Sequence, residues 1–424
     1  MTQEKLLTKE IQARVARVRR AIRGLHKNSA LIVSSGVTKQ RSRDLSFPFS
    51  QDENFFYLTG SALPDTSLLI FSDNRIPLLI TPEISAEKLI WEGQGENPKR
   101  VARRIGAHLV TSNSTLTEIR THIETGVEWL FHPNEQGQDG YTIAQELLAR
   151  PSHRRRNEPV ILAHLDTVLE PLRLRKSPYE VRQTRQAVDV AWKSLQGIRH
   201  LLTPAITEEQ IALALRHGIE SQHSSESFPS IVASGPNAAV LHHTPSTRKL
   251  KSGEYLTIDF GAIAGGYASD VTRVFAIGEE NPPTPHREAY DLLRETQRHI
   301  VSRVRPGRVW RDLQNETEEL LLKGLRDIGL LKGSLPKLRK ERAVREFFPH
   351  SLGHALGLAV HDVGALRSTG DAVLAPGMLV TVEPGIYSRH GTKRVPPFGM
   401  RIEDDVLVTK SGAKNLTHMI PIEP

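Results

Sequence analysis

The second half of the chain places acidic residues at fixed points inside runs of apolar residues that are typical of buried strands. The three stretches are YLTIDFGAIAGGYASDVTRVFAIG, LVTVEPGIY and MRIEDDVLVT. A polar or charged group inside a buried strand costs free energy unless another group pairs with it. Any fold open to this chain must therefore compensate these carboxylates, and a metal centre would supply the pairing.

The first stretch carries two aspartates, Asp259 and Asp270, at the ends of two apolar runs with glycines between them. Their separation is typical of a hairpin, which would bring the two carboxylates side by side. Two close carboxylates repel each other, so one must take up a proton or both must share a cation. The alternative is that one aspartate belongs to a turn and the other pairs with Arg273.

Further candidate ligands follow in the sequence. The segment FFPHSLGHALGLAVHDVG contains His350, His354 and His361, and Glu383 and Glu403 lie in two later apolar stretches. One histidine among apolar residues is usually a core residue, but three histidines followed by two such carboxylates are hard to explain by packing. One imidazole and four carboxylates form an oxygen-rich set suited to two divalent ions, with Mn²⁺ favoured and Co²⁺ or Zn²⁺ as alternatives.

Composition excludes other kinds of site and indicates a compartment. The chain has no cysteine, which excludes thiolate ligands and disulfides and fits a reducing compartment. No apolar run approaches the roughly 18 residues that span a bilayer. The amino terminus lacks the apolar stretch of a signal peptide and contains Glu4 and Glu10, so we expect it to form a helix. These features predict a cytoplasmic protein with no membrane partner.

The net charge of 56 − 48 = +8 raises the question of a nucleic-acid partner. Basic residues cluster at 154–156, 173–176 and 337–342, in stretches whose composition is typical of linkers or loops and which contain few aromatic residues for base stacking. We interpret these clusters as solvated surface and expect no nucleic-acid partner.

The 424 residues suggest about two domains. Residues 1–172 alternate helical patterns with short apolar runs and predict an α/β domain, whereas residues 173–424 predict an α+β domain with much antiparallel strand. The strands expected in the first half are Ala30–Val33, Ser67–Phe71, Pro77–Ile80, Glu128–Phe131 and Val160–Leu162. The helices expected in the second half lie near Glu180–Leu202, Pro285–Val304 and Trp310–Ile328.

These stretches resemble the pita-bread metallopeptidases, which include X-Pro aminopeptidase, prolidase, methionine aminopeptidase and the metal-free creatinase. The family's ordered ligands fall in TIDFG, SDVTR, SLGHALGL, TVEPGIY and RIEDD, and QDENFFYLTG resembles a segment of its amino-terminal half. The resemblance implies a creatinase-like α/β domain at 1–172 and a pita-bread catalytic domain at 173–424. It implies the metal ligands Asp259, Asp270, His354, Glu383 and Glu403.

The resemblance also implies a mechanism. Two cations lower the pKa of a bridging water, so that hydroxide attacks the scissile carbonyl without a strong side-chain base. Glu383 would be both a ligand and a proton shuttle. His361, together with His242 in LHHTPS, would stabilise the oxyanion and hold the substrate.

Three further residues, His350, Tyr387 and Arg401, would bind the substrate by the same resemblance. Two of them have plain alternatives. Tyr387 could equally be a half-buried strand residue, and Arg401 could be an ion-pair partner of Glu383 or Asp404.

The activity implied is that of an X-Pro aminopeptidase, which acts on peptides whose second residue is proline. The closest alternative is the X-Pro dipeptidase prolidase, which shares the metal ligands. Many relatives carry Arg-Gly before the last metal glutamate, whereas KRVPPFGMRIEDD has Pro396 and Pro397 near that place and Arg394 two positions earlier. This difference favours the aminopeptidase.

Other members of the family fit less well. Methionine aminopeptidase lacks an amino-terminal domain of this size. A non-catalytic binding module, like creatinase, should show gaps in the ligand set, but all five positions are filled here. Relatives are commonly dimers or tetramers, which suggests a homodimer or homotetramer.

Overall fold

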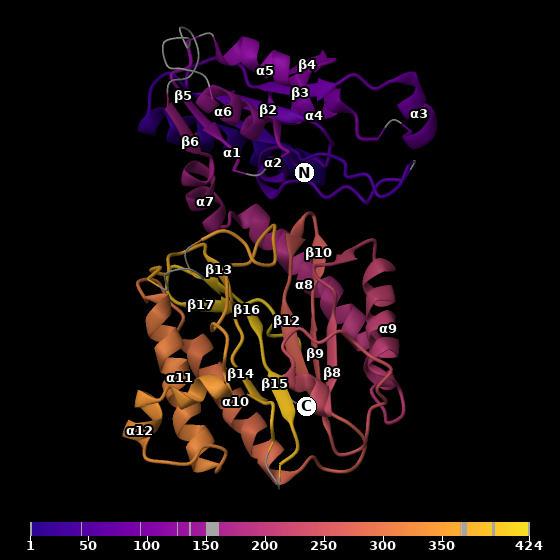
Figure 1. The fold of residues 1–424 in the computed structure, drawn as a ribbon, viewed down its shortest axis with the longest axis vertical. Helices are drawn as coiled ribbons and strands as arrows, with labels where there is room; N and C mark the ends of the chain where they lie inside the picture. Colours follow the sequence, from indigo (N-terminus) through magenta and orange to yellow (C-terminus); the bar gives the residue numbers. More distant parts are fainter. Residues whose placement is uncertain are drawn as a thin grey trace. The chain divides into compact units, whose positions relative to one another are not determined.

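The computed structural model covers residues 1–424 and describes all of them except 1, 44, 94, 125, 135–136, 150–160, 365, 367–370, 392–394 and 423–424. The described residues form two compact units, Met1–Arg173 and Leu174–Pro424 (Figure 1). The division falls at the end of helix α7, Asp166–Leu174, close to the boundary predicted near residue 172. In the described part of the chain, no helix is long and apolar enough to cross a bilayer.

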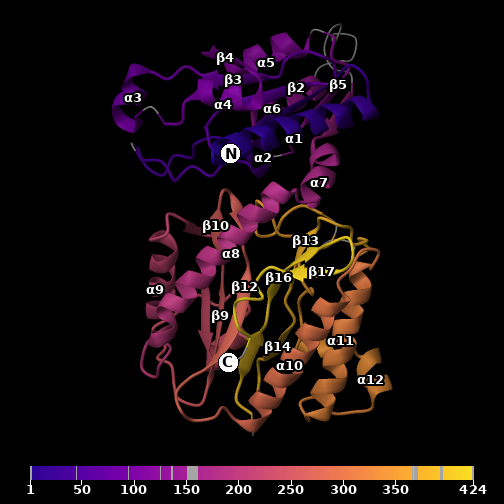
Figure 2. The same cartoon turned by 180° about the vertical axis from the view of Figure 1, so that it is seen from behind.

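The first unit is built on a mixed six-stranded sheet with the order β4-β3-β2-β1-β5-β6. Its strands are β1 Ser29–Ser34, β2 Ser67–Phe71, β3 Leu78–Pro82, β4 His108–Ser112, β5 Trp129–His132 and β6 Ile161–His164. Its helices are α1 Gln3–Leu25, α2 Glu53–Thr59, α3 Ala86–Glu92, α4 Pro98–Ile105, α5 Thr115–Ile123, α6 Asp139–Ala149 and α7. Every residue of β1 is buried, because helices pack along both faces of the sheet (Figures 1 and 2).

The strands predicted in the first half overlap β1, β2, β3, β5 and β6, and the amino-terminal helix is confirmed as α1. Val160, the first residue of the last predicted strand, lies outside the described residues. The sequence did not reveal β4, which lies at the edge of the sheet and has no buried residue. An edge strand of this kind lacks the apolar run on which the prediction depends.

The second unit combines helices with short strands, mostly in antiparallel pairs, which confirms the α+β prediction. Its helices are α8 Pro178–Ile198, α9 Glu208–Glu220, α10 Thr284–Arg303, α11 Trp310–Asp327 and α12 Leu335–Lys340, with 3₁₀ turns η2 Arg199–Leu201, η3 Gly235–Ala239 and η4 Ala343–Glu346. Its first strands are β7 Ser225–Glu226, β8 Ile231–Ser234, β9 Tyr255–Phe260, β10 Ala262–Ala264, β11 Tyr267–Ala268 and β12 Val271–Ala276. The later strands are β13 Leu379–Val382, β14 Gly385–Ser388, β15 Phe398–Arg401, β16 Asp404–Val408 and β17 Ala413–Asn415.

Local signals in the sequence explain where α8 begins. The Ser177 hydroxyl accepts a hydrogen bond from the backbone N–H of Glu180, whose carboxylate accepts one from the backbone N–H of Ser177. Pro178 occupies the first helical position, where a missing N–H costs little. Within the unit, α8 and α9 pack beside β8 and β10, whereas α10 contacts the strands from β13 onward (Figures 1 and 2).

The interpretation of the basic clusters as solvated surface is wrong for Arg173 and Lys176 in the cluster at 173–176. Lys176 is buried, and its Nζ lies 2.7 Å from Oδ2 of Asp362, whose side chain is 2% exposed. Arg173 is also buried and donates a hydrogen bond to Asn54. The basic residues of the cluster at 337–342 are exposed, as predicted, although most of this cluster belongs to helix α12 and not to a loop. The cluster at 154–156 lies outside the described residues.

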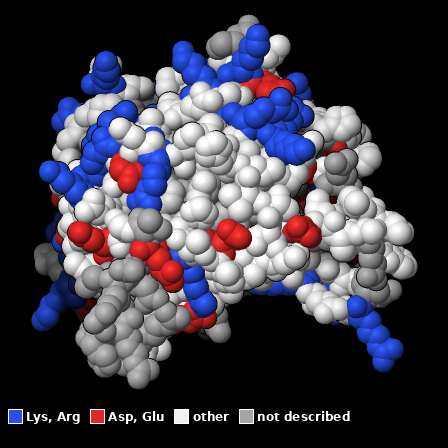
Figure 3. All heavy atoms as spheres, turned by 90° about the horizontal axis from the view of Figure 1, so that it is seen from above, with Lys and Arg blue, Asp and Glu red and all other residues white. Residues whose placement is uncertain are grey.

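Charged residues on the surface are mixed in sign where Figure 3 shows them. Lys and Arg lie mainly toward the margins of that face, and its middle is occupied by uncharged residues with some Asp and Glu. A nucleic-acid groove needs a continuous basic stripe. This face therefore offers no such groove among the described residues.

The Lys176–Asp362 pair predicts a large effect on stability. Replacing Lys176 by Met should lower the free energy of unfolding by about 3–5 kcal/mol, because the buried Asp362 carboxylate loses its cation. Denaturant titration measures the change. The control is the double change Lys176→Met with Asp362→Leu, which removes both charges and should recover most of the loss. A cost for Lys176→Met below about 1 kcal/mol would show that the pair behaves like a surface ion pair.

Candidate metal centre

The two aspartates of the first acidic stretch lie on one face of an antiparallel strand pair. Strands β9 and β12 pair in the register that sets Asp259 directly opposite Thr272, and Asp270 lies immediately before β12. Side chains two residues apart on a strand point to the same face, so Asp259, Asp270 and Thr272 share one side of the ladder. The hairpin predicted from the spacing is confirmed.

The two glutamates lie where a second antiparallel ladder is interrupted. Strands β13 and β16 pair up to Val382 and Asp404, and strands β14 and β15 resume the pairing at Gly385 and Arg401. Glu383 and Glu403 occupy the break between these two ladders. The backbone N–H of Glu383 bonds instead to the carbonyl of Leu352 at 2.9 Å, and that of Glu403 to the carbonyl of Thr272 at 3.2 Å. The break therefore connects each glutamate to a different segment of the site.

His354 is fixed against β13 by its backbone. Its N–H donates to the hydroxyl of Thr381 at 3.0 Å, and its carbonyl accepts from the N–H of Thr381 at 2.9 Å. The imidazole donates from Nδ1 to the carbonyl of Ala355 at 3.1 Å, which leaves Nε2 as the free ring nitrogen. That Nε2 lies 3.5 Å from Oδ2 of Asp270 and 3.4 Å from Oε1 of Glu383.

The resulting cluster has the composition of a metal site. Among the described residues, Asp270, His354 and Glu403 each offer a ligand atom, and these atoms all lie within 4.8 Å of one another. Glu383 adjoins the group through its contact with His354. Asp259 lies on the same face of the β9–β12 ladder as Asp270. The structure thus gathers the five residues that the sequence singled out.

The electrostatics of the cluster are those of crowded carboxylates. Burial raises the pKa of Asp270 well above its ordinary value, and the charges of Asp259, Asp405 and Glu383 add to the shift. Burial and the neighbouring acids raise the pKa of Glu403 in the same direction. Carboxylates at this distance are not all ionised together unless a cation compensates them.

The donor atoms fit a hard divalent cation. Oδ1 of Asp259 and Oδ1 of Asp270 are buried and accept no hydrogen bond from the described residues. Buried carboxylate oxygens without donors, with one imidazole nitrogen among them, match the ligands that divalent ions such as Mn²⁺ take in proteins. The residues present therefore fit the implied metal.

Two threonines that the sequence reasoning missed orient the glutamates. The Thr272 hydroxyl donates to Oε2 of Glu403 at 2.7 Å, and the Thr381 hydroxyl donates to Oε1 of Glu383 at 3.2 Å. A signal for them was present, because each threonine lies two residues along a strand from a candidate ligand, Asp270 or Glu383. Strand alternation places such a residue on the same face as the ligand.

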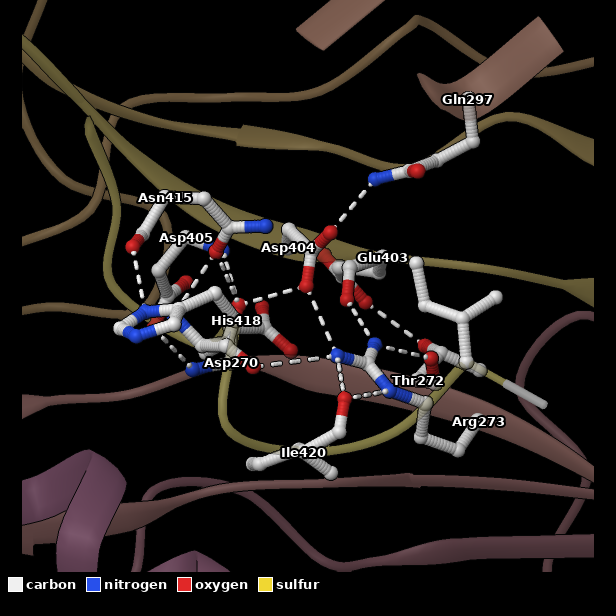
Figure 4. Close-up of polar contacts among 12 residues, drawn as sticks. Asp270, Thr272, Arg273, Gln297, Glu403, Asp404, Asp405, Asn415, His418 and Ile420 are labelled. Carbon is white, nitrogen blue, oxygen red and sulfur yellow. Dashed lines mark hydrogen bonds and ion pairs between the residues drawn. The ribbon is translucent and has the colours of Figure 1, made fainter. Parts of the chain in front are cut away.

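A buried ion pair holds the backbone at Glu403 in place (Figure 4). Nη2 of Arg273 lies 2.8 Å from Oδ1 of Asp404, and both side chains are 1% exposed. Nη1 of Arg273 donates to the carbonyl of Glu403 at 2.6 Å, while Gln297 donates to the other oxygen of Asp404. The alternative in which Arg273 pairs with one of the hairpin aspartates is therefore wrong.

Arg401 pairs with Asp259, rather than with Glu383 or Asp404 as the sequence alternative proposed. Its Nη1 also donates to the hydroxyl of Tyr387 at 2.7 Å. Both side chains are buried, with 2% of Tyr387 exposed, so Tyr387 is not the half-buried strand residue of the sequence alternative. Burial raises the pKa of Tyr387 to about 12, so its hydroxyl keeps its proton at neutral pH.

His350 lies between this buried pair and the more exposed part of the site. Its Nδ1 donates to the carbonyl of Ser351 at 2.8 Å, and its Nε2 lies 3.2 Å from the Tyr387 hydroxyl. Burial lowers the pKa of His350 to about 3, and the charge of Arg401 contributes. His350 is therefore neutral at physiological pH.

The remaining two histidines are exposed. The ring centroids of His361 and His354 are 4.2 Å apart, and the two rings meet edge to face. His242 lies in the turn after η3, and its charge is one of the causes that lower the pKa of His350. Buried acids thus form the inner part of the site, and His242 and His361 lie toward solvent.

Comparison with known protein families identifies both parts of the chain. The pattern of Metallopeptidase family M24 matches residues 182–410, and that of the Aminopeptidase P, N-terminal domain matches residues 13–129. The Xaa-Pro aminopeptidase of Haemophilus influenzae is 32% identical over 99% of this chain and 96% of its own. The Intermediate cleaving peptidase 55, mitochondrial, of Arabidopsis thaliana is 29% identical over 97% of this chain and 81% of its own.

Solved structures show the same architecture. Aminopeptidase P from E. coli in its low-pH form superposes with a TM-score of 0.89 at 27% identity, over 98% of this chain and 96% of that one. The Zn-substituted form of that enzyme in complex with product gives a TM-score of 0.88 at 28% identity, over the same shares of both chains. The predicted pita-bread fold and the predicted enzyme class are confirmed. The chain belongs to metallopeptidase family M24, with an aminopeptidase P amino-terminal domain preceding its catalytic domain.

Proposed function

We propose that this protein is an X-Pro aminopeptidase that uses two divalent metal ions to remove the first residue from peptides with proline in second position. The observation that carries the proposal is the buried cluster of Asp270, His354 and Glu403, with Asp259 and Glu383 beside it. The names of the similar proteins support the choice of substrate.

The five residues Asp259, Asp270, His354, Glu383 and Glu403 would hold the ions. Their oxygen-rich set favours Mn²⁺, with Co²⁺ or Zn²⁺ as alternatives. When bound, the ions supply a water molecule of lowered pKa as the nucleophile and stabilise negative charge on the substrate. The buried oxygens of Asp259 and Asp270 that accept no hydrogen bond from the described residues support this assignment.

Glu383 would move a proton during the reaction. Its Oε1 accepts from Thr381, and its Oε2 lies 4.0 Å from Nδ1 of His350. Burial raises the pKa of Glu383, which favours a carboxylate that takes a proton from the attacking water. Glu383 would then return this proton to the proline nitrogen as the peptide bond breaks.

The histidines would bind the substrate and the developing oxyanion. His361 and His242 are both exposed, which supports a role as donors to a peptide carbonyl. The partly exposed His350 would contact the substrate directly. We also assign Tyr387 and Arg401 to substrate binding. Their side chains are buried, and Tyr387 contacts His350 while Arg401 pairs with Asp259, so they would act mainly by fixing these two neighbours.

The dipeptidase alternative depends on the segment before β15. Arg394, the arginine that could clamp a free carboxylate, lies outside the described residues. Pro396 is exposed, its carbonyl bonds to the imidazole of His286, and that imidazole packs against Phe398. Two prolines and this contact make the start of β15 rigid. A rigid segment without an arginine at 396 or 397 favours a pocket that stays open beyond the proline.

Two further assignments stay proposals. We propose that the protein acts in the cytoplasm, and the mitochondrial location in the name of the Arabidopsis relative belongs to that relative. We also propose a homodimer or homotetramer, which gel filtration with light scattering would test.

The Asp270→Asn variant tests the metal assignment. We expect it to lose essentially all turnover, because a neutral amide cannot compensate two cations. The measurement is kcat on an X-Pro-Y tripeptide with Mn²⁺. Retention of more than about a tenth of the wild-type kcat, a loss of only ~1.4 kcal/mol, would show that Asp270 is not a ligand of the ions.

The His361→Ala variant tests the oxyanion role. We expect the bound metal to stay near the wild-type amount and kcat to fall by roughly 10²–10³, as for the loss of one oxyanion donor. Elemental analysis and steady-state kinetics on the same preparation give both numbers. If the variant lost a metal ion, His361 would have to be reassigned as a ligand.

Substrate length separates the aminopeptidase from the dipeptidase. We expect kcat/KM for an X-Pro-Y tripeptide to exceed that for the matching X-Pro dipeptide by at least about tenfold, or ~1.4 kcal/mol of transition-state binding. A panel of both peptide lengths with Mn²⁺ present provides the comparison. A preference for the dipeptide would establish the prolidase alternative.

A further inference from the structure

One buried carboxylate outside the metal cluster, that of Glu208, accepts many hydrogen bonds. Glu208 is completely buried at the start of α9. Its Oε1 accepts from the N–H and the hydroxyl of Ser234 at 2.8 and 2.7 Å, and the amide of Asn237 contacts both of its oxygens. Its Oε2 accepts from Nε2 of His243 at 2.9 Å and from the N–H and hydroxyl of Ser246 at 3.2 and 2.7 Å.

Capping of α9 does not explain this arrangement. The helix is already capped by Thr207 and Gln210, whose side chains bond to each other's backbone N–H groups. All the partners of the Glu208 side chain named above belong instead to one segment, residues 234–246, which runs from the end of β8 through η3. The carboxylate is therefore directed at that segment.

The donors lie on both sides of His242 in the sequence. Ser234 and Asn237 precede it, and His243 and Ser246 follow it. His243 is largely buried, with 14% of its side chain exposed, whereas its neighbour His242 is exposed. Glu208 thus holds the segment on both sides of His242, whose own side chain stays exposed.

The same segment is packed against the strand that leads to the metal site. A Cβ atom added at Gly399 of β15 would lie 1.8 Å from the carbonyl oxygen of Ala238 in η3, so the two backbones are in direct contact. Strand β15 ends at Arg401, which pairs with Asp259. A shift of the segment would therefore change where His242 lies relative to the site.

Glu208 acts as an ionised acceptor. Burial opposes its ionisation, but hydrogen bonds from Ser246, His243 and Ser234 outweigh burial and lower the pKa of this carboxyl. Hydrogen bonds to a charged acceptor are about twice as strong as neutral ones. A carboxylate with this many donors is costly to replace by any neutral group.

We propose that Glu208 is a positioning residue, which fixes residues 234–246 through His243 and its other donors and so holds His242 at the substrate side of the metal centre. This inference rests on the proposed function, because it assigns the anchor of a histidine that the proposed function places against the substrate.

The test is a double-mutant cycle between His243 and His242 in the Mn²⁺-loaded protein. His243→Ala should lower kcat/KM for an X-Pro-Y tripeptide about tenfold, whereas His243→Gln, which keeps a donor, should stay within about twofold of wild type. In the His242→Ala background, His243→Ala should lower kcat/KM by less than about a further twofold. The histidine that His243 positions is already absent there.

A second readout does not depend on activity. In the Zn²⁺-loaded protein with labelled histidines, the ring signals of His242 should shift in His243→Ala and in Glu208→Gln. They should stay in place in Glu209→Gln, which changes an exposed neighbour on the same helix. Bound metal should remain near the wild-type amount in His243→Ala, because none of the five candidate ligands has changed.

The outcomes distinguish a failure of the positioning role of Glu208 from a failure of the proposed function. If His242→Ala lowers turnover, but the double variant loses the product of the two single losses in kcat/KM, the positioning inference is overturned and the proposed function stands. Unchanged ring signals of His242 in His243→Ala would overturn it as well. If His242→Ala alone keeps wild-type turnover, the role proposed for His242 fails, and the inference fails with it.

Discussion

The cost of burying several carboxylates in one core is the constraint on which the rest of the catalytic unit depends. Asp259, Asp270 and Glu403 are each less than a tenth exposed, and burial raises the pKa of Asp270 and Glu403 well above the ordinary range. The guanidinium of Arg401 supplies one positive charge to this group, through Asp259. One cation does not compensate so many acids, and bound metal would supply the missing positive charge.

The strands are arranged to meet that constraint. The β9–β12 ladder places two aspartates on one face, and the interruption between the β13–β16 and β14–β15 ladders brings two glutamates to the same region. The backbone N–H groups released by the interruption bond to Leu352 and Thr272, so the break leaves no buried donor unpaired there. Behind Glu403, the Arg273–Asp404 pair fixes the backbone from which this side chain projects. A site held at this many points needs little rearrangement when it binds a cation.

Much of this could be predicted from sequence, because it depends on residues close together in the chain. The spacing of Asp259 and Asp270 indicated their hairpin, and Ser177 with Glu180 marks the start of α8. The errors concern partners far apart in sequence. Lys176 finds Asp362, Arg273 finds Asp404, and Arg401 finds Asp259, each across more than a hundred residues. Composition and periodicity carry no information about such pairings, so a buried Lys176 looked like a solvated one. The role of Glu208 could not be predicted for the same reason, because its donors lie on a segment that only the fold brings to α9.

If the buried acids bind two metal ions, the ions can be counted. Mn²⁺ would be titrated into chelator-stripped protein by calorimetry, with elemental analysis of the dialysed complex as an independent count. The account predicts two equivalents per chain, with Tm raised by the ligand because the ions bind the folded state. Protein that binds no divalent ion, and whose Tm does not respond to Mn²⁺, Co²⁺ or Zn²⁺, would contradict the account.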